Sequence, residues 1–392
     1  MRVAFVSSDP GVPVFGSKGC SVHVQEMLRF FLREVGAEVS LYTSRTGGEV
    51  PAEFGEVVVR PTEIAGGTHR NRELQLVELN QEVELLLERD GPFDLVYERY
   101  ALFGHAGMTY ALRASIPGVL EVNAPLIGEQ QRHRQLVHAT EAEQNSRMAF
   151  DAASSIIAVA DGVKEYVESL CSSPHKIHVV PNGVDPGRFR PDATATLPRK
   201  PGTFTVGFVG SLKPWHGLQD LVEAFRLLRR DVPEARLLVV GDGPERTSVE
   251  VALTDADLSD VAHFTGAVSH ADVPGWLASM DVAVGPYPQE TNCYFSPLKI
   301  FEYMAAGLPV VATSTGQIPQ IVDDGETGIL TRPGRPDELA SALQRLYRDG
   351  ALAASMSRAA RERAVSRHTW SAAGHRILEI AGLAIDSSEV IA

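Results

Sequence analysis

The chain has 392 residues, of which 44% are hydrophobic and 22% charged, a composition typical of a soluble globular protein too long for one ordinary core. Its 50 acidic and 36 basic residues give a formal net charge of −14, which argues against general nucleic-acid binding. The cysteines are odd in number and far apart, and the first apolar run stops at Ser7, so neither a disulfide framework nor a signal peptide is indicated. We expect a cytoplasmic protein and leave open a peripheral contact with the inner face of a membrane.

In the first half of the chain, short apolar runs alternate with longer amphipathic ones. Buried strands are indicated at 3–6, 39–42, 95–97, 119–122, 156–159 and 177–180. A helix is indicated at 21–34, after a glycine-bearing loop. A segment rich in Pro, Gly and charge follows, and we interpret 191–202 as a linker that ends a first domain of residues 1–190.

The same alternation restarts after the linker. Strands are predicted at 204–209, 236–240, 263–265, 282–284 and 310–312, and a helix at 218–230. Such alternation is typical of parallel sheets with crossover helices. We therefore predict an α/β protein of two facing, Rossmann-like, doubly wound domains, the second spanning 203–370, with the ligand site in the cleft between them. A last helical stretch within 370–392 either covers the second domain or packs back on the first.

The most informative stretch is 290–312. A loop holding Pro297 and Lys299 opens an amphipathic helix that carries Glu302, and a buried strand follows a turn of small residues. The start of such a helix offers unpaired N–H groups and a partial positive charge to an anion. One turn further on, Glu302 can accept hydrogen bonds from vicinal hydroxyls. A phosphate site beside a carboxylate that binds hydroxyls is what a sugar nucleotide requires.

A second loop of the same domain, within 207–225, carries two glycines. Gly210 ends a strand and Gly217 precedes a helix, with Lys213 and His216 between them. Glycines let a backbone approach a phosphate closely, and a lysine supplies a point charge. Taken alone, the pattern is explained equally well by an ordinary strand-to-helix loop. Together with the element at 297–302 it favours phosphate binding.

Near the N terminus, Gly16 and Gly19 lie between the first strand and the first helix, where they would face the cleft. The segment is neither a Walker loop nor the GxGxxG fingerprint of dinucleotide binding. We interpret His23, one turn into the helix, as a packed histidine.

Together these segments resemble the retaining glycosyltransferases of family 4, which have the GT-B fold. The similarity covers most of the chain, and its most specific parts are NGVD at 182–185 and FEYMAAGLPVVAT at 301–313. The resemblance implies an enzyme that moves a sugar from a nucleotide-diphosphate donor to an acceptor hydroxyl with retention of configuration.

The resemblance also implies donor contacts, residue by residue. Glu302 matches the family's second glutamate, which holds the ribose hydroxyls, and Val268 falls where the backbone reads the nucleotide base. Gly16 and Gly19 match the loop that lies against the donor phosphates. The remaining donor-binding positions are Gly210, Ser211, Phe295, Ser296, Pro297 and Leu298.

Some positions of the second domain depart from the family pattern. Tyr294 stands eight residues before the matched glutamate, where the family has its first glutamate. Ser211 and His216 stand where the family has an arginine and a lysine. Lys213 and Lys299 can replace the missing charges.

In the first domain, Asn123 in LEVNAPL stands where the family has a histidine. An asparagine can hydrogen-bond a sugar hydroxyl but cannot carry a proton, so general-base catalysis at this position is excluded. The candidate catalytic residues are accordingly Asn123, Lys213, Lys299 and His216.

In the mechanism that the resemblance implies, the protein does not have to supply a nucleophile. The departing nucleoside diphosphate gains negative charge, which the lysines, His216 and the helix start near Pro297 are expected to stabilise. The acceptor hydroxyl attacks from the face that the leaving group departs, and a phosphate oxygen takes its proton. No cofactor and no metal is then required, and we interpret the DxD string at Asp255 and Asp257 as solvated surface.

Basic residues of the first half are candidate acceptor contacts. Arg99 follows a strand end within YERY, and Arg132 belongs to a cluster with His133 and Arg134. An anionic acceptor or membrane surface is one interpretation, and solvated helix faces with interleaved glutamates are another. The expected partners are a nucleotide sugar and an acceptor that is a glycan, a lipid-linked molecule or a small metabolite.

Two other functions stay open from the sequence. One is a GT-B enzyme of another class, such as a nucleotide-sugar epimerase or a phosphorylase. Tyr294 and Asn123 argue against the acid–base groups of an epimerase, and no motif indicates the pyridoxal lysine of a phosphorylase. The other is a non-catalytic partner subunit that binds sugar nucleotide, which the missing arginine and glutamate keep open. The nucleotide base, the donor sugar, the acceptor and the oligomeric state do not follow from the sequence.

Overall fold

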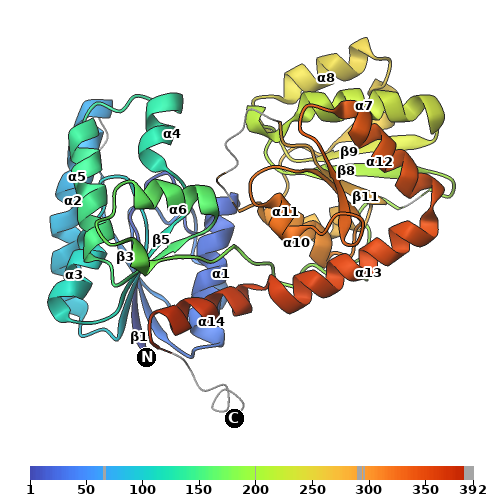
Figure 1. Cartoon of the computed structure of the whole chain (residues 1–392). Coiled ribbons are helices and arrows are strands. Elements are labelled where there is room, and N and C mark those ends of the chain that lie inside the picture. Colours follow the sequence, from blue (N-terminus) through green and yellow to red (C-terminus); the bar gives the residue numbers. More distant parts are fainter. Residues whose placement is uncertain (65–67, 199, 289–293, 295, 384–392) are drawn as a thin grey trace. The chain divides into compact units, whose positions relative to one another are not determined.

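The structure is a computed structural model that describes residues 1–383 except 65–67, 199, 289–293 and 295. Its contacts divide the chain into two compact units. The first comprises residues 1–182, 294–296 and the described residues from 370 onward, and the second comprises 183–293 and 297–369. Each unit is a parallel sheet flanked by helices (Figure 1).

In the described part of the first unit, seven parallel strands form one sheet in the order β3-β2-β1-β4-β5-β6-β7. Its strands are β1 (Arg2–Ser7), β2 (Glu38–Thr43), β3 (Val58–Pro61), β4 (Leu95–Arg99), β5 (Gly118–Val122), β6 (Ser155–Ala158) and β7 (Ile177–Val179). Every residue of β4, β5 and β6 is buried, as expected for central strands that are covered on both faces.

Helices cover both faces of this sheet. They are α1 (Gly19–Arg33), α2 (His69–Asp90), α3 (Ala106–Ala114), α4 (Leu126–His133), α5 (Ala139–Ala152), α6 (Asp161–Glu168) and α14 (Trp370–Ile380), with short turns η1 (Ala52–Phe54) and η2 (Pro174–Lys176). One face packs Val6 and Val96 into a core with α2, α3 and α5. On the other face, Phe5 and Tyr97 pack against Phe31 of α1.

The described part of the second unit repeats the plan with six parallel strands in the order β10-β9-β8-β11-β12-β13. Its strands are β8 (Phe204–Val209), β9 (Ala235–Val240), β10 (Ala262–Phe264), β11 (Val282–Gly285), β12 (Val310–Thr313) and β13 (Gly328–Thr331). Its helices are α7 (Leu218–Asp231), α8 (Arg246–Asp255), α9 (Val273–Leu277), α10 (Leu298–Ala305), α11 (Ile318–Ile321), α12 (Pro336–Arg348) and α13 (Gly350–Arg367), with turns η3 (Pro214–His216) and η4 (Ser259–Val261).

The two units share one topology, which determines where a ligand can bind. Numbered within its own unit, each sheet has the strand order of doubly wound folds, in which the chain reverses direction beside its first strand. Ligands of such sheets bind beyond the carboxyl ends of the strands at this switch point. The switch lies between β1 and β4 in the first unit and between β8 and β11 in the second.

The structure confirms every strand predicted from the apolar runs and adds two. β3 and β13 were not expected; each is only four residues long and lies at an edge of its sheet. The segment 191–202, expected to be a linker, is hydrogen-bonded to the second unit: the Thr196 N–H donates to the Gly275 carbonyl over 2.9 Å. The Leu197 N–H donates to Ser279 Oγ, also over 2.9 Å.

Helix α14 belongs to the first unit and packs on α1. The Trp370 ring lies 5.0 Å from the His23 ring, measured between centroids. Ser371 Oγ donates to Glu34 Oε2 over 2.6 Å. Gly374 faces Phe30 so closely that a Cβ at this position would lie 2.6 Å from three ring carbons.

No helix within the described residues combines the length and the apolar character that crossing a membrane would require.

Replacing Gly374 by alanine tests the packing of α14. Alanine favours a helix over glycine by about 1 kcal/mol, but its methyl group would collide with the buried Phe30 ring. We expect Gly374→Ala to lower the free energy of unfolding by about 1–3 kcal/mol, measured by denaturant titration.

The matched control is Gly350→Ala at the first residue of α13, where nothing lies within 4 Å of the new Cβ. This control should be neutral or stabilising. Equal stabilisation by both substitutions would mean that α14 does not pack on Phe30 as described.

Candidate active site

At the switch point of the second unit, two glycines allow loops to approach each other closely. Gly217, with φ +64°, precedes α7, and a Cβ there would lie 1.6 Å from the Pro286 carbonyl oxygen after β11. Gly210, with φ +143°, follows β8, and a Cβ there would lie 2.7 Å from Lys299 Nζ. Residues with side chains would hold these segments apart.

Lys299, in the first turn of α10, places its ammonium group in this crowded region. The side chain is half-buried, but its Nζ is shielded from solvent and has no hydrogen-bond partner among the described residues. Nζ lies 4.2 Å from the ring centroid of Phe208 and 5.5 Å from that of Tyr287. Burial lowers the pKa of Lys299 to about 7, although the Glu302 carboxylate opposes this shift. An unpaired buried ammonium is unfavourable without an anion.

His216 packs beside Lys299 as a neutral imidazole. Its Nδ1 donates to the Ser211 carbonyl, which fixes the tautomer and leaves Nε2 as an acceptor. Burial lowers the pKa of His216 to about 3, with further lowering by the charges of Lys299 and Lys213. His216 therefore brings no positive charge at neutral pH. Lys213 lies at the loop surface, with its Nζ 5.7 Å from the ring centroid of the exposed Trp215.

Among the described residues, no side chain blocks the start of α10 with a capping hydrogen bond. Pro297 is its N-cap residue, no side chain caps the helix, and its first turn, beginning at Leu298, holds no acidic residue. Ser296 lies just before it and accepts a hydrogen bond from the Asn182 N–H through its Oγ, over 3.1 Å. Phe295 lies outside the described residues.

Glu302, one turn into α10, is held by a histidine. His270 Nε2 lies 2.9 Å from Glu302 Oε1, and His270 Nδ1 lies 3.1 Å from Arg188 NH1. Val268, expected beside the base, lies two residues before His270 in the loop after β10, which turns at Gly266 with φ +71°.

In the first unit, the loop after β1 is shaped around Gly16. The Gly16 N–H donates to the Pro13 carbonyl over 3.0 Å, and a Cβ on Gly16 would lie 2.9 Å from the Pro13 ring. Gln25 of α1 donates to the carbonyls of Val14 and Gly16 over 2.8 and 2.9 Å. Gly19 is the first residue of α1, which has no side-chain cap.

Asn123 and Arg132 differ in their surroundings. Asn123 follows β5, and its Nδ2 is buried without a hydrogen-bond partner among the described residues. This amide therefore has an unused donor at the carboxyl edge of the sheet. Arg132 is exposed on α4.

Arg99, at the end of β4, belongs to a row of buried side chains that are joined by hydrogen bonds. Its NH1 lies 2.8 Å from His23 Nδ1, and His23 Nε2 lies 2.7 Å from Glu121 Oε1. Tyr97 donates to the second oxygen of Glu121 over 2.6 Å. Burial alone would raise the pKa of Glu121, but His23, Arg99 and Tyr97 together hold it below its ordinary value.

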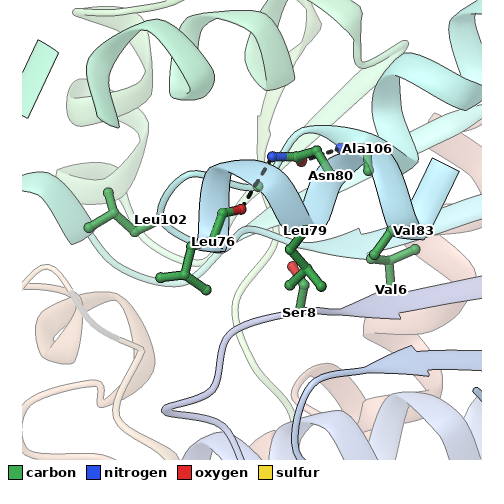
Figure 2. Close-up of a pocket in the computed structure, with 9 residues that line it drawn as sticks. Val6, Ser8, Leu76, Leu79, Asn80, Val83, Leu102 and Ala106 are labelled. Atoms are coloured by element: carbon green, nitrogen blue, oxygen red, sulfur yellow. Dashed lines mark hydrogen bonds between the residues drawn. The ribbon is translucent and has the colours of Figure 1, made fainter. Parts of the chain in front are cut away.

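Asn80 of α2 fastens the loop that follows β4. Its Nδ2 donates to the carbonyl of Phe103, which has φ +73°, and its Oδ1 accepts from the N–H groups of His105 and Ala106. Figure 2 shows the small pocket beside Asn80, with Ser8 as its other polar side chain. The other side chains of its lining are aliphatic, which does not suit a sugar or a phosphate.

Tyr294, at the position of the family's first glutamate, belongs by its contacts to the first unit. Its hydroxyl donates to Glu129 of α4, and its Cβ would lie 3.1 Å from a Cβ on Gly162. Within these contacts Tyr294 acts as a packing residue.

Two family models match consecutive parts of the chain. The model for Glycosyltransferase Family 4 matches residues 17–188, and the model for Glycosyl transferases group 1 matches residues 203–349. The chain belongs to the family 4 glycosyltransferases. Its structure has the GT-B fold of two Rossmann-like units.

Curated proteins that are similar to this glycosyltransferase are themselves named as enzymes that transfer sugars. A D-inositol 3-phosphate glycosyltransferase from Pseudarthrobacter chlorophenolicus is 29% identical over 94% of this chain and 91% of its own length. A 2-deoxystreptamine glucosyltransferase from Streptomyces kanamyceticus is 31% identical over 55% of each chain. These names support an enzyme over the non-catalytic subunit and over an epimerase or a phosphorylase.

Solved structures share the fold of this glycosyltransferase. The sucrose-phosphate synthase of Thermosynechococcus elongatus superposes with a TM-score of 0.77 at 20% identity, covering 97% of this chain and 98% of its own. HepE from Anabaena, solved in complex with UDP and glucose, superposes with a TM-score of 0.69 at 18% identity, covering 97% and 99%.

The glycosyltransferase brings several of its predicted site residues together in the second unit. Gly210, Lys299, His216 and the start of α10 lie around one point, whereas Lys213 lies at the surface of the same loop. Sequence reasoning missed His270, whose only signal was its place two residues after Val268. It also missed the hydrogen bonds of His23, which is packed as expected.

Removing the charge of Lys299 should stabilise the ligand-free glycosyltransferase. Because its folded-state pKa of about 7 lies below the ordinary lysine value of 10.5, the unfolded chain holds the proton more tightly. The resulting penalty on folding is full below pH 7 and disappears as pH rises toward 10.5. We expect Lys299→Met to raise stability at pH 7 by about 2 kcal/mol or more, and Tm by roughly 5 °C or more.

The difference from wild type should shrink when the same melts are run near pH 10. Lys164→Met on α6 is the control: that lysine is exposed, lies 3.7 Å from Glu168 Oε1, and its replacement should not raise Tm. A lower Tm for Lys299→Met at pH 7 would contradict an unpaired buried ammonium.

Proposed function

We propose that this glycosyltransferase transfers a sugar from a nucleoside diphosphate to an acceptor hydroxyl with retention of anomeric configuration and without a metal ion. The observation that carries the proposal is the Lys299 ammonium group, which is shielded and has no hydrogen-bond partner within the described residues. A buried cation beside the uncapped start of α10 fits a diphosphate, because both supply the positive charge that a phosphate needs.

The diphosphate leaves as the bond between the anomeric carbon and the phosphate oxygen breaks. Negative charge grows on that oxygen, and Lys299 and the start of α10 stabilise it. The acceptor oxygen forms the new bond on the face from which the diphosphate departs, and its proton passes to the departing phosphate oxygen. Lys299 and α10 supply the countercharge that a metal ion would otherwise supply. The neutral His216 contributes Nε2 as an acceptor rather than a charge.

Polar groups other than Lys299 bind the hydroxyls of the ribose and of the donor sugar. Glu302 accepts from the ribose hydroxyls through the carboxylate oxygen that His270 does not contact. The Val268 backbone lies against the base, and Asn123 Nδ2 donates to a donor-sugar hydroxyl. Gly16, in the loop after β1, and Gly19, at the start of α1, are the positions that we assign to the donor phosphates in the first unit.

We base the class of acceptor on the names of the relatives and on basic side chains of the first unit. The relatives named above act, by their names, on D-inositol 3-phosphate and on 2-deoxystreptamine, which supports a small polyhydroxylated acceptor. A relative named as a phosphatidylinositol monomannoside mannosyltransferase keeps a lipid-linked acceptor, and with it a peripheral membrane contact, within the proposal. Arg99 and the exposed Arg132 are the candidate contacts for an anionic acceptor group.

The proposal is tested first by nucleotide binding. Thermal melts are recorded with UDP, GDP, ADP, CDP and dTDP, each with magnesium and with EDTA. A nucleotide at about 100 times its dissociation constant adds roughly 2.7 kcal/mol to the folded state. We expect one or two nucleotides to raise Tm equally with and without metal. No shift with any nucleotide would overturn the proposed donor, and a shift only with magnesium would overturn metal independence.

Turnover tests the role assigned to Lys299. With the donor chosen from the melts, Lys299→Met should cut kcat by about two orders of magnitude or more, since a cation at the leaving oxygen is lost. The same variant should melt at or above the wild-type temperature, so the loss cannot be attributed to unfolding. Unchanged turnover would mean that the phosphates bind elsewhere.

A further inference from the structure

A chain of three side chains in the second unit links segments that lie far apart in the sequence. Arg188 lies in the segment after β7, His270 in the loop after β10, and Glu302 on α10. Arg188 NH1 is 3.1 Å from His270 Nδ1, and His270 Nε2 is 2.9 Å from Glu302 Oε1. The chain is not required by the proposed transfer step itself.

The partners of His270 decide which of its nitrogens carries the hydrogen. An arginine can only donate, so His270 Nδ1 must accept from Arg188. The imidazole hydrogen is therefore on Nε2, which donates to Glu302 Oε1. A proton on Nδ1 would set two donors against each other. The arrangement thus consists of a cation, a neutral imidazole and a carboxylate, each with a defined hydrogen-bond role.

The pair formed by His270 and Glu302 is largely shielded from solvent, which helps to maintain this geometry. The side chains of His270 and Glu302 are 19% and 12% exposed. The Phe189 ring packs against the His270 ring with a centroid distance of 5.4 Å. With Arg188 on one nitrogen, Glu302 on the other and the tilted Phe189 ring packed against it, the imidazole has little freedom to rotate.

One carboxylate oxygen of Glu302 is left for a ligand. Oε1 is occupied by His270, and the described residues offer no hydrogen bond to Oε2. A carboxylate held through one oxygen presents the other in a defined direction, which a freely rotating glutamate would not. Because Val268 lies two residues before His270, the same histidine also ties the Val268 segment to α10.

We infer that His270 is a positioning residue: it orients Glu302 toward the ribose hydroxyls and couples that contact to the loop that reads the base. The inference rests on the proposed nucleotide-sugar donor. It assigns to His270 an effect on donor binding and on discrimination at the ribose, with no direct part in bond cleavage.

The test compares the nucleoside diphosphate that wild type binds with its 2′-deoxy counterpart. Binding is measured by titration calorimetry, and donor KM and kcat by a transfer assay. We expect wild type to prefer the ribonucleotide by about tenfold or more. We expect His270→Ala to raise donor KM about tenfold, to leave kcat within about threefold, and to lose most of the preference.

A conservative variant of His270 and a double variant with Glu302 distinguish a positioning role from a general disturbance of the structure. His270→Gln can place an amide N–H near the position of Nε2 and should recover much of the ribose preference, whereas His270→Ala should not. The ribose preference should be equally low in Glu302→Ala and in the double variant, because His270 acts through Glu302. His263→Ala, at an exposed histidine of β10 in the same unit, is the control and should match wild type.

The outcomes distinguish the inference from the proposed function. If wild type binds none of the nucleotides, the proposed donor is wrong. If wild type prefers the ribonucleotide and Glu302→Ala loses that preference but His270→Ala, folded by its melt, keeps it, the inference alone is overturned. If His270→Ala loses the ribose preference and His270→Gln does not recover it, the inference is also overturned. The effect would then not depend on a hydrogen-bond donor to Glu302.

Discussion

The Lys299 ammonium group is the constraint on which the candidate site depends. It is shielded from water, lies against two aromatic rings and has no hydrogen-bond partner in the described part of the chain. Several neighbours are arranged around it: glycine at position 210 leaves it room, and His216 stays neutral beside it. A phosphate would supply the missing anion and bring the lysine to full protonation. Without such an anion this charge opposes folding, as is common where a binding site stores unfavourable charge.

In both units a histidine joins an arginine to a glutamate through hydrogen bonds. In the first unit Arg99 is joined through His23 to Glu121, and in the second Arg188 is joined through His270 to Glu302. In each chain an arginine donates to Nδ1, so Nε2 carries the hydrogen that the glutamate accepts. The member proposed to contact a ligand is the arginine in the first chain and the glutamate in the second. Rigid hydrogen-bonded support of this kind directs a long side chain at little entropic cost on binding.

The fold followed from the sequence more fully than the site. Central strands were predictable because strands covered on both faces are continuous apolar runs. β3 and β13 were missed because each has only two consecutive apolar residues within a four-residue strand: β3 reads VVRP and β13 reads GILT. In the candidate site, Lys299 and Glu302 could be singled out because the local sequence around a helix start is typical of an anion site. His270 and His23 were not, since their roles come from contacts with residues more than 30 positions away in sequence.

The return of α14 to the first unit has a consequence for how the chain folds. Most of this unit is formed by residues 1–182, but it also includes a helix that begins at residue 370, so its last element is made long after the rest. Until that helix is synthesised, the Phe30 and His23 side of α1 has no cover from Trp370 and Gly374. The second unit, between these parts, can complete its own sheet first. During translation the nascent chain must therefore carry an exposed aromatic surface, a state in which multidomain proteins rely on chaperones.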